Sequence, residues 1–282
     1  MLSLIEKYGG FVENKNKNIH SDDFIKFLGT AGARFVVSKQ LRASGGLWFS
    51  LGGQDVLVDP GPGSLLRCLA SRPKLDPSIL SGIILTHRHL DHSNDINVII
   101  EAMTNGGMNK KGFLYAPGDA LDARDPVVQI YVREFLGEIG YLEEGKTIDR
   151  ASFSFSTPVR HQHPVETYGL KFYLPYGCIS LISDTAFFPE LIDHYRGSDL
   201  LILNVVIFQD YVSKEIFHLS FNQAKKIIKE IRPKTAILTH FGMTMLQQKP
   251  YFLARSLQEE LGIKVIAAID GLKIEPLNVL FS

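Results

Sequence analysis

Three histidines and an aspartate lie within six residues of one another, in the sequence T-H-R-H-L-D-H. They are His87, His89, Asp91 and His92. Imidazole nitrogens and carboxylate oxygens are good ligands for zinc, iron and manganese. His87 and His89 are two residues apart, so on an extended segment they point to the same side and can hold one ion. Asp91 and His92 follow a turn and face another direction, which predicts a second ion close to the first.

The residues around this cluster predict a strand before it and a helix after it. The apolar run 83–85 is typical of a buried strand. Ser93 or Asn94 can cap a helix that starts at Asp95. A loop between a strand and a helix would hold the cluster at one edge of a sheet. The alternative is a polar turn that happens to be rich in histidine.

A second histidine pair follows a strand predicted at 153–157. His161 and His163 are also two residues apart, and their spacing does not decide which of them binds metal. At this point the chain resembles a known family. T-H-R-H-L-D-H resembles the H-x-H-x-D-H signature of the metallo-β-lactamase superfamily, and H-P-V-E-T-Y-G resembles the third metal motif of its tRNase Z-like, phosphodiesterase branch. The resemblance assigns His163 as the ligand. His161 would then contact a ligand, line the pocket or lie in solvent.

The resemblance extends to three further residues that follow predicted strands. Asp184, after the strand 179–182, resembles the bridging carboxylate of the family; its alternative role is to cap a helix near Pro189. His240 follows the strand 235–239 and resembles the last metal motif. Asp59 follows the strand 56–58, and the family has an aspartate there that hydrogen-bonds a metal-binding imidazole. The alternative for Asp59 is a turn residue before Pro60.

The resemblance therefore implies a site for two divalent metal ions. Zinc is the default, with manganese and iron as alternatives, because this set of ligands suits all three. Two ions held close together can share a hydroxide, which is the expected nucleophile. The first ion takes His87, His89 and His163, the second takes Asp91, His92 and His240, and Asp184 bridges them.

Asp91 and His218 are the predicted catalytic residues. His218 precedes a helix predicted from Phe221 to Ile231, with Ser220 as its N-cap. It resembles the histidine of an H-S-T-type motif that lies by the scissile phosphate, where it could bind a phosphate oxygen or protonate the leaving alkoxide. The alternative interpretation is that His218 is an ordinary surface histidine. Asn204 stands where tRNase Z-like sequences often have a glutamate, so this chain departs from their proton relay at that position.

Composition sets the broad class of the protein. The chain has 282 residues, of which 45% are hydrophobic and 21% charged. This length and composition predict one domain over 1–282, with a peripheral segment at 1–23. Lys+Arg and Asp+Glu both number 30, so the formal net charge is zero. This disfavours binding to long nucleic acid, which usually requires an excess of basic residues. The two cysteines form no disulfide framework, which predicts a cytoplasmic protein. No apolar run is long enough to span a membrane.

The resemblance implies an α/β fold, the four-layer αββα sandwich, and a binuclear metal-dependent hydrolase. The predicted activity is that of a phosphodiesterase for a small or cyclic nucleotide-type phosphodiester. The stretch from His163 to Asp184 is too short for the Gly- and Pro-rich arm of tRNase Z. The alternative activity is a thioester or lactone hydrolase, similar to glyoxalase II or to lactonases. The expected partner is a small-molecule substrate, with a homodimer as an open alternative.

The region 105–150 carries no motif. Its residues predict a strand at 112–116 and an amphipathic helix over 125–137. The sequence assigns this region no role in the site.

Overall fold

The computed structural model describes residues 22–122, 124–210 and 216–281. The peripheral segment expected at 1–23 lies outside these residues, apart from its last two. Of those two, Asp23 is buried, because its carboxylate accepts hydrogen bonds from Gly52 N and from the Tyr176 hydroxyl, both at 2.8 Å. Asp23 is therefore part of the folded body and not of a surface loop.

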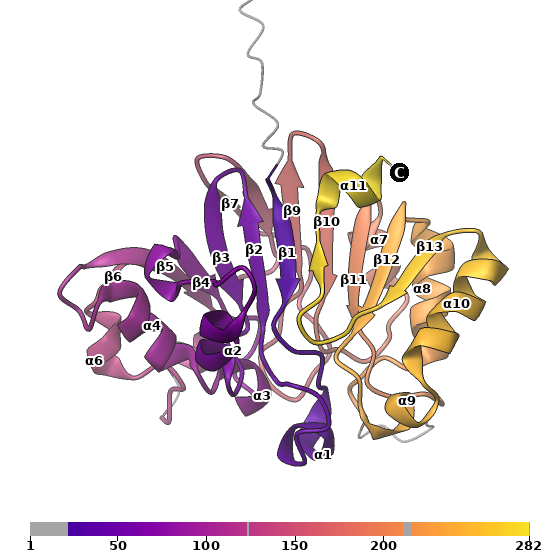
Figure 1. Ribbon diagram of the computed structural model, residues 1–282, viewed down its shortest axis with the longest axis horizontal. Coiled ribbons are helices and arrows are strands. Elements are labelled where there is room, and N and C mark those ends of the chain that lie inside the picture. The colour runs from indigo at the N-terminus through magenta and orange to yellow at the C-terminus, as the bar shows by residue number, and fades with distance from the viewer. Residues whose placement is uncertain (1–21, 123, 211–215, 282) are drawn as a thin grey trace, which may run out of the picture.

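Two seven-stranded sheets face each other and form the centre of the molecule (Figure 1). The first sheet has the order β14-β1-β2-β3-β4-β5-β6, and the second has the order β13-β12-β11-β10-β9-β8-β7. The first sheet consists of β1 (Phe24–Phe27), β2 (Leu47–Leu51), β3 (Gln54–Val58), β4 (Gly82–Ile84), β5 (Lys111–Ala116), β6 (Leu136–Tyr141) and β14 (Lys273–Ile274). The second consists of β7 (Thr147–Asp149), β8 (Ser154–Ser156), β9 (Leu170–Leu174), β10 (Gly177–Ile182), β11 (Leu200–Asn204), β12 (Thr235–Thr239) and β13 (Lys264–Ala267).

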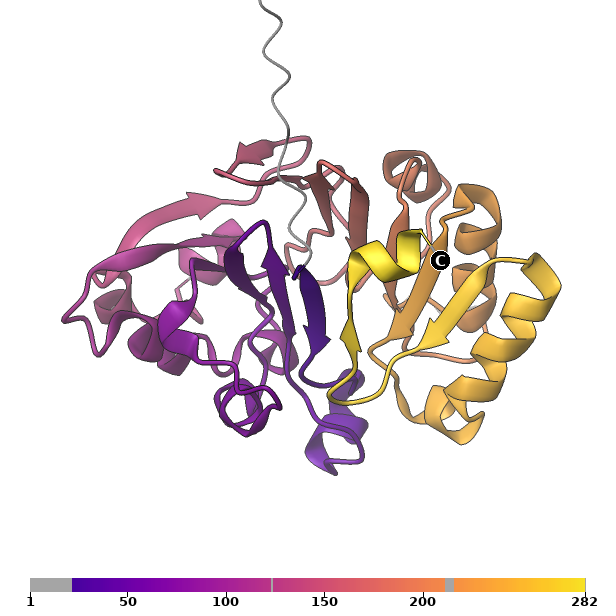
Figure 2. The same ribbon diagram turned by 45° about the horizontal axis from the view of Figure 1, so that its top comes forward.

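Helices cover the outer face of each sheet, as Figure 2 shows from a second direction. The chain before β7 contains α1 (Ala33–Ser38), α2 (Ser64–Ala70), η1 (Pro77–Ile79), α3 (Leu90–Ser93), α4 (Ile96–Thr104), α5 (Gly118–Leu121) and α6 (Ile130–Arg133). The chain after β10 contains α7 (Glu190–Tyr195), α8 (Phe221–Ile231), α9 (Met243–Gln247), α10 (Pro250–Leu261) and α11 (Pro276–Leu280). The predicted αββα sandwich is confirmed. None of the helices in the described ranges is long and apolar enough to cross a membrane.

Alternating side chains of the strands fill two kinds of core. In β2, Phe49 and Leu51 point into the core between the sheets, where Phe49 stacks on Phe172 with ring centroids 4.8 Å apart. Trp48 points the other way, into the core between the first sheet and its helices. Because both faces of the sheets are covered, the strands read as nearly continuous apolar runs. This packing holds the ends of the strands, and the loops that follow them, in fixed positions.

The structure corrects two local predictions. The helix predicted over 125–137 is wrong: only α6 (Ile130–Arg133) is helical there, and Leu136 begins the edge strand β6. Most of β6 faces solvent, so its sequence lacks the alternation that identifies a half-buried strand. The caps predicted at Ser93 and Asn94 are also wrong, because α3 ends at Ser93 and Asp95 occupies the N-cap position of α4.

Candidate metal centre

The predicted metal-site residues lie in loops and in the short helix α3 at one edge of the sandwich. β3 and β4 run parallel, and so do β10, β11 and β12, so within each sheet their carboxyl ends meet at one edge. His87 and His89 follow β4, and Asp91 and His92 lie in α3 directly after them. The other three come from the second sheet. They are His163 between β8 and β9, Asp184 after β10 and His240 after β12.

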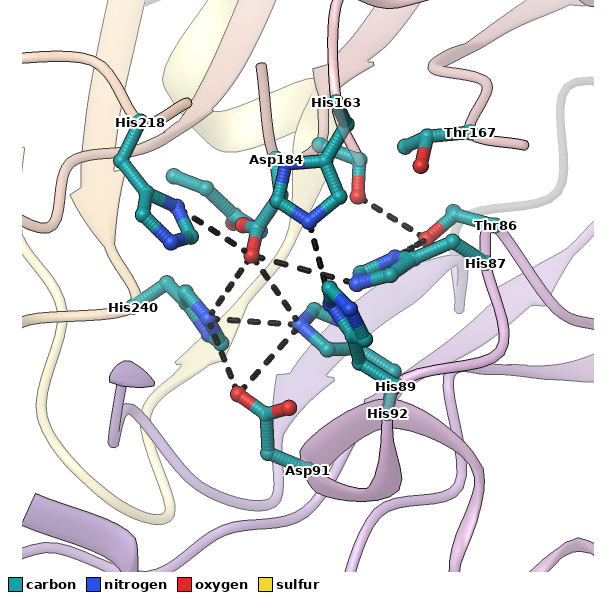
Figure 3. Close-up of polar contacts among 12 residues, drawn as sticks. Thr86, His87, His89, Asp91, His92, His163, Thr167, Asp184, His218 and His240 are labelled. Carbon is teal, nitrogen blue, oxygen red and sulfur yellow. Dashed lines mark hydrogen bonds and ion pairs between the residues drawn. The ribbon is translucent and has the colours of Figure 1, made fainter. Parts of the chain in front are cut away.

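The first group of converging side chains is His87, His89 and His163. Their ring nitrogens all lie within 4.8 Å of one another. His163 Nε2 lies 3.0 Å from His89 Nδ1, as Figure 3 shows. The His87 ring is fully buried, and its Nε2 has no hydrogen-bond partner among the described residues. These are the three ligands predicted for the first ion.

The second group is Asp91, His92 and His240. Asp91 Oδ2 lies 3.8 Å from His92 Nε2 and 3.5 Å from His240 Nε2. The two imidazoles face each other with their Nε2 atoms 3.3 Å apart (Figure 3). The structure thus brings together the three ligands predicted for the second ion.

Asp184 lies between the two groups. Its Oδ2 atom is 3.9 Å from His87 Nε2 in the first group, and 3.6 Å and 3.5 Å from the Nε2 atoms of His92 and His240 in the second. One oxygen within reach of both groups has the geometry of the predicted bridge. Burial would raise the pKa of Asp184, but the neighbouring His240 and His218 outweigh it and hold that pKa well below its usual range. The carboxylate therefore stays ionised.

The side chains fit a cation better than they fit one another. His92 Nδ1 donates to Asp59, and His92 Nε2 faces His240 Nε2 across 3.3 Å. Burial lowers the pKa of His92, but the neighbouring Asp91, Asp59 and Asp184 outweigh it and raise that pKa well above its ordinary value. Burial lowers the pKa of His87 well below its ordinary value and that of His163 to about 4, so both rings are neutral at neutral pH. Neutral imidazoles are the form that binds metal, so His87 and His163 are ready to bind, whereas His92 would have to release a proton. Ligation by these seven residues stays a prediction.

Further hydrogen bonds orient these side chains from behind. Asp59 Oδ2 accepts from His92 Nδ1 at 2.9 Å and from the Thr86 hydroxyl at 2.8 Å, so Asp59 has the contact expected of it. Thr86 Oγ1 also lies 3.1 Å from His87 Nδ1 and 2.9 Å from Ser183 Oγ. Such contacts fix the ring orientation of a ligand. Thr86 and Ser183 each directly precede a predicted ligand, but neither carries a motif of its own in the sequence.

Asn204 occupies a related position beside the proposed bridge. Its Nδ2 donates to Asp184 Oδ1 at 2.8 Å, which leaves Oδ2 facing the histidines. The amide thus orients the carboxylate, whereas a glutamate at this position would add a negative charge beside it.

His161 and His163 have different surroundings. The His161 ring is buried, with Nδ1 donating to the Asp184 carbonyl at 3.3 Å and Nε2 accepting from the Tyr195 hydroxyl at 3.0 Å. Burial lowers the pKa of His161 to about 3. Both ring nitrogens are therefore used within the protein. Of the two, it is His163 that faces the other predicted ligands.

His218 lies at the edge of the same cluster and is not a surface histidine. Its Nδ1 is 3.4 Å from Asp184 Oδ2, and its ring centroid is 5.2 Å from that of His163. The loop that carries it is fixed by the start of α8, where Ser220 forms the predicted N-cap. The Ser220 hydroxyl accepts from Gln223 N at 3.1 Å, and the Gln223 side chain accepts from Ser220 N at 3.0 Å.

A cavity of about 460 Å³ opens beside the cluster. His218 lies on its wall together with ligands from both groups. The full lining is Arg34, His89, Leu90, Asp91, His163, Pro164, Asp184, Phe217 and His218. A cavity of similar size, about 490 Å³, lies near Gly52 and Tyr176 at the opposite strand ends, and no histidine of the described residues lines it. The cavity beside the cluster is therefore the candidate substrate site.

Comparison with solved structures gives the same fold. The metallo-β-lactamase fold protein YhfI from Bacillus subtilis superposes with a TM-score of 0.74 at 20% identity, over 90% of this chain and 99% of its own. A diphosphatase from the PhnP family superposes with a TM-score of 0.67 at 20% identity, over 90% of this chain and 97% of its own. At this identity the likeness concerns the fold alone.

Sequence comparison gives the family. The uncharacterized protein MJ1374 of Methanocaldococcus jannaschii is 32% identical over 262 residues, which cover 90% of this chain and 95% of that protein. The family model described as "Beta-lactamase superfamily domain" matches residues 54–241, a range that contains all seven predicted ligands. The chain therefore belongs to the metallo-β-lactamase superfamily of metal-dependent hydrolases.

Proposed function

We propose that this protein is a phosphodiesterase that hydrolyses small phosphodiesters, of which cyclic nucleotides are one class, with two divalent metal ions. The observation that carries the proposal is the position of His218. It shares a cavity wall with His89, Asp91, His163 and Asp184, within reach of a group held by the metal ligands. When bound, the ions would supply Lewis-acid activation of the phosphate and of the attacking water.

The residues of the chain would then position the substrate and move a proton. Asp184 faces His218 Nδ1, which leaves His218 Nε2 as the atom that would donate a proton to the leaving oxygen. Burial lowers the pKa of His218 and Asp184 offsets this only in part, so the protonated ring is the minor form at neutral pH. A leaving alkoxide is a strong base, so proton donation accelerates the cleavage of a phosphodiester. A thiolate is a far weaker base and gains less, so a proton donor in this position favours the phosphodiester over the thioester.

The segment between His163 and Asp184 favours a small substrate. It contains the antiparallel hairpin of β9 (Leu170–Leu174) and β10 (Gly177–Ile182), joined by Pro175 and Tyr176. No long arm for a macromolecular substrate projects from this stretch, all of which is described. The equal numbers of acidic and basic residues also give no general attraction to long nucleic acid.

The proposal is tested with metal-loaded protein and three substrates: bis(p-nitrophenyl) phosphate, a 3′,5′-cyclic nucleotide and a thioester. We expect turnover of both phosphodiesters. We expect His218→Ala to lower kcat for the cyclic nucleotide, whose leaving group is an alkoxide, by about 10²- to 10⁴-fold without loss of bound metal, and to lower kcat for bis(p-nitrophenyl) phosphate much less, because nitrophenolate leaves without a proton. His194→Ala, which removes an exposed histidine of α7, is the matched control and should keep full activity. Preferred hydrolysis of the thioester, or full activity of His218→Ala on the cyclic nucleotide, would overturn the proposal.

A further inference from the structure

The segment that contains α1 (Ala33–Ser38) is fixed directly against a predicted metal ligand. Phe241 N donates to the Thr30 carbonyl at 2.8 Å, and Gly32 N donates to the Phe241 carbonyl at 3.0 Å. A Cβ atom on Gly32 would lie 2.0 Å from the His240 carbonyl oxygen, so only glycine allows this approach. The start of α1 therefore cannot move independently of the loop that carries His240.

One carboxylate closes the segment at both ends. Asp270 Oδ1 accepts from Thr30 N at 2.9 Å and from the Thr30 hydroxyl at 2.7 Å, before α1. Asp270 Oδ2 accepts from Ala43 N at 2.7 Å, after α1. The two oxygens of Asp270 thus hold both ends of the segment that contains α1. The turn at Asp270 and Gly271 has this structural role.

Arg34 extends from this segment to the wall of the candidate substrate site. It lines the 460 Å³ cavity together with His89, His163 and His218. In the described part of the chain, no hydrogen bond or ion pair joins the Arg34 guanidinium to another residue. Arginine has five N–H donors in a planar fork that matches two oxygens of a phosphate. Arg34 is exposed to solvent, so these donors are accessible to a ligand in the cavity.

We propose that Arg34 binds the anionic phosphate of the substrate and makes the site selective for charged phosphodiesters over neutral esters. This inference rests on the proposed function and adds the residue that recognises the charge. The charge-assisted bonds of a guanidinium to phosphate oxygens have no counterpart in a neutral ester. Leu90, Pro164 and Phe217 on the same lining offer apolar contact to the organic part of the ester. Asp270 acts as a positioning residue, because it holds the segment that carries Arg34.

Two esters with the same leaving group test this selectivity: bis(p-nitrophenyl) phosphate, which is an anion, and p-nitrophenyl acetate, which is neutral. We expect Arg34→Ala to raise KM for the phosphodiester about 10-fold, with a much smaller change in kcat, and to leave hydrolysis of the acetate unchanged. Arg34→Lys keeps the charge without the fork and should restore part of the loss. Arg67→Ala on α2, which also removes one exposed arginine, is the matched control and should behave as the wild type.

A binding measurement separates this inference from the proposed function. Calorimetric titration of the metal-loaded proteins with inorganic phosphate should give a Kd about 10-fold higher for Arg34→Ala than for the wild type and Arg67→Ala. An unchanged phosphate Kd and an unchanged KM in Arg34→Ala would overturn the role of Arg34 and leave the phosphodiesterase intact. A wild type that hydrolyses no phosphodiester would overturn the proposed function, and the phosphate titration would still decide whether Arg34 binds the anion.

Discussion

His161 and His163 show how two identical side chains, two residues apart, take up different tasks. The spacing argument assumes an extended segment, whose alternate side chains share a face. The structure has an irregular loop here, apart from a bridge between Arg160 and Tyr168. The loop turns His161 into the protein, against Tyr195, and leaves His163 at the cavity. The resemblance favoured His163, and the geometry gives a physical reason for the difference.

Substitution of each histidine by glutamine tests this division. We expect His163→Gln to lose bound metal, because it removes one of the nitrogens of the first group. His161→Gln should keep its metal but lower the free energy of unfolding by about 1–3 kcal/mol, since it disturbs the buried partner of the Tyr195 hydroxyl. Metal analysis and urea denaturation measure the two effects. Equal metal loss in both variants would contradict the assignment.

At the scale of elements, close backbone contacts between loops set the positions of the ligands. The turn after β3 contains Gly61, at which a Cβ atom would lie 1.9 Å from the Asp91 carbonyl oxygen. In the same turn, the Pro60 carbonyl accepts a hydrogen bond from Asp95 N at 2.9 Å. The loop after β3 therefore supports α3, which carries Asp91 and His92. A side chain at position 61 would displace this support.

We expect Gly61→Ala to weaken metal binding and to destabilise the fold by about 1–3 kcal/mol, because the new methyl group forces the two loops apart. Gly197→Ala is the control: its methyl group meets open space, and its positive φ of 77° costs only about 1–2 kcal/mol of backbone strain. Competition with a metal-sensitive dye and urea denaturation measure the two quantities. Wild-type metal affinity in Gly61→Ala would show that α3 does not depend on this contact.

At the scale of the whole molecule, the candidate metal centre joins the two halves of the sandwich. Four predicted ligands follow β4 in the first sheet, and the other three come from the second sheet. A metal ion bound here would bind only the folded state, in which both sheets are in place. Bound metal should therefore stabilise the entire fold and not only one loop.

Removal of the metal by a chelator should lower the melting temperature. At free zinc about 1,000 times its Kd, binding contributes about 4 kcal/mol to the free energy of unfolding. Calorimetry of metal-loaded, stripped and zinc-restored protein measures this, and the restored sample serves as the control for damage by the chelator. The same melting temperature in stripped and loaded samples, with metal loss verified by analysis, would show that the centre does not join the halves.

The sequence by itself determined the features that depend on neighbouring residues. Local spacing predicts two such features: the cluster from His87 to His92, and the helix from Phe221 to Ile231 with its cap at Ser220. The structure has both at the predicted residues. The αββα fold followed from the resemblance of several such motifs in order. The edge strand β6 was missed, because its exposed side chains carry no alternating pattern.

The tertiary structure decided what depends on contacts between distant segments. The choice between His161 and His163, the support of His92 by Asp59, and the fixing of the Arg34 segment by Asp270 all join residues that lie far apart in the chain. Asp270 and Thr30 are 240 positions apart, and nothing in the local sequence of either indicates the other. Such pairs form only when the packed sheets bring their loops to one edge.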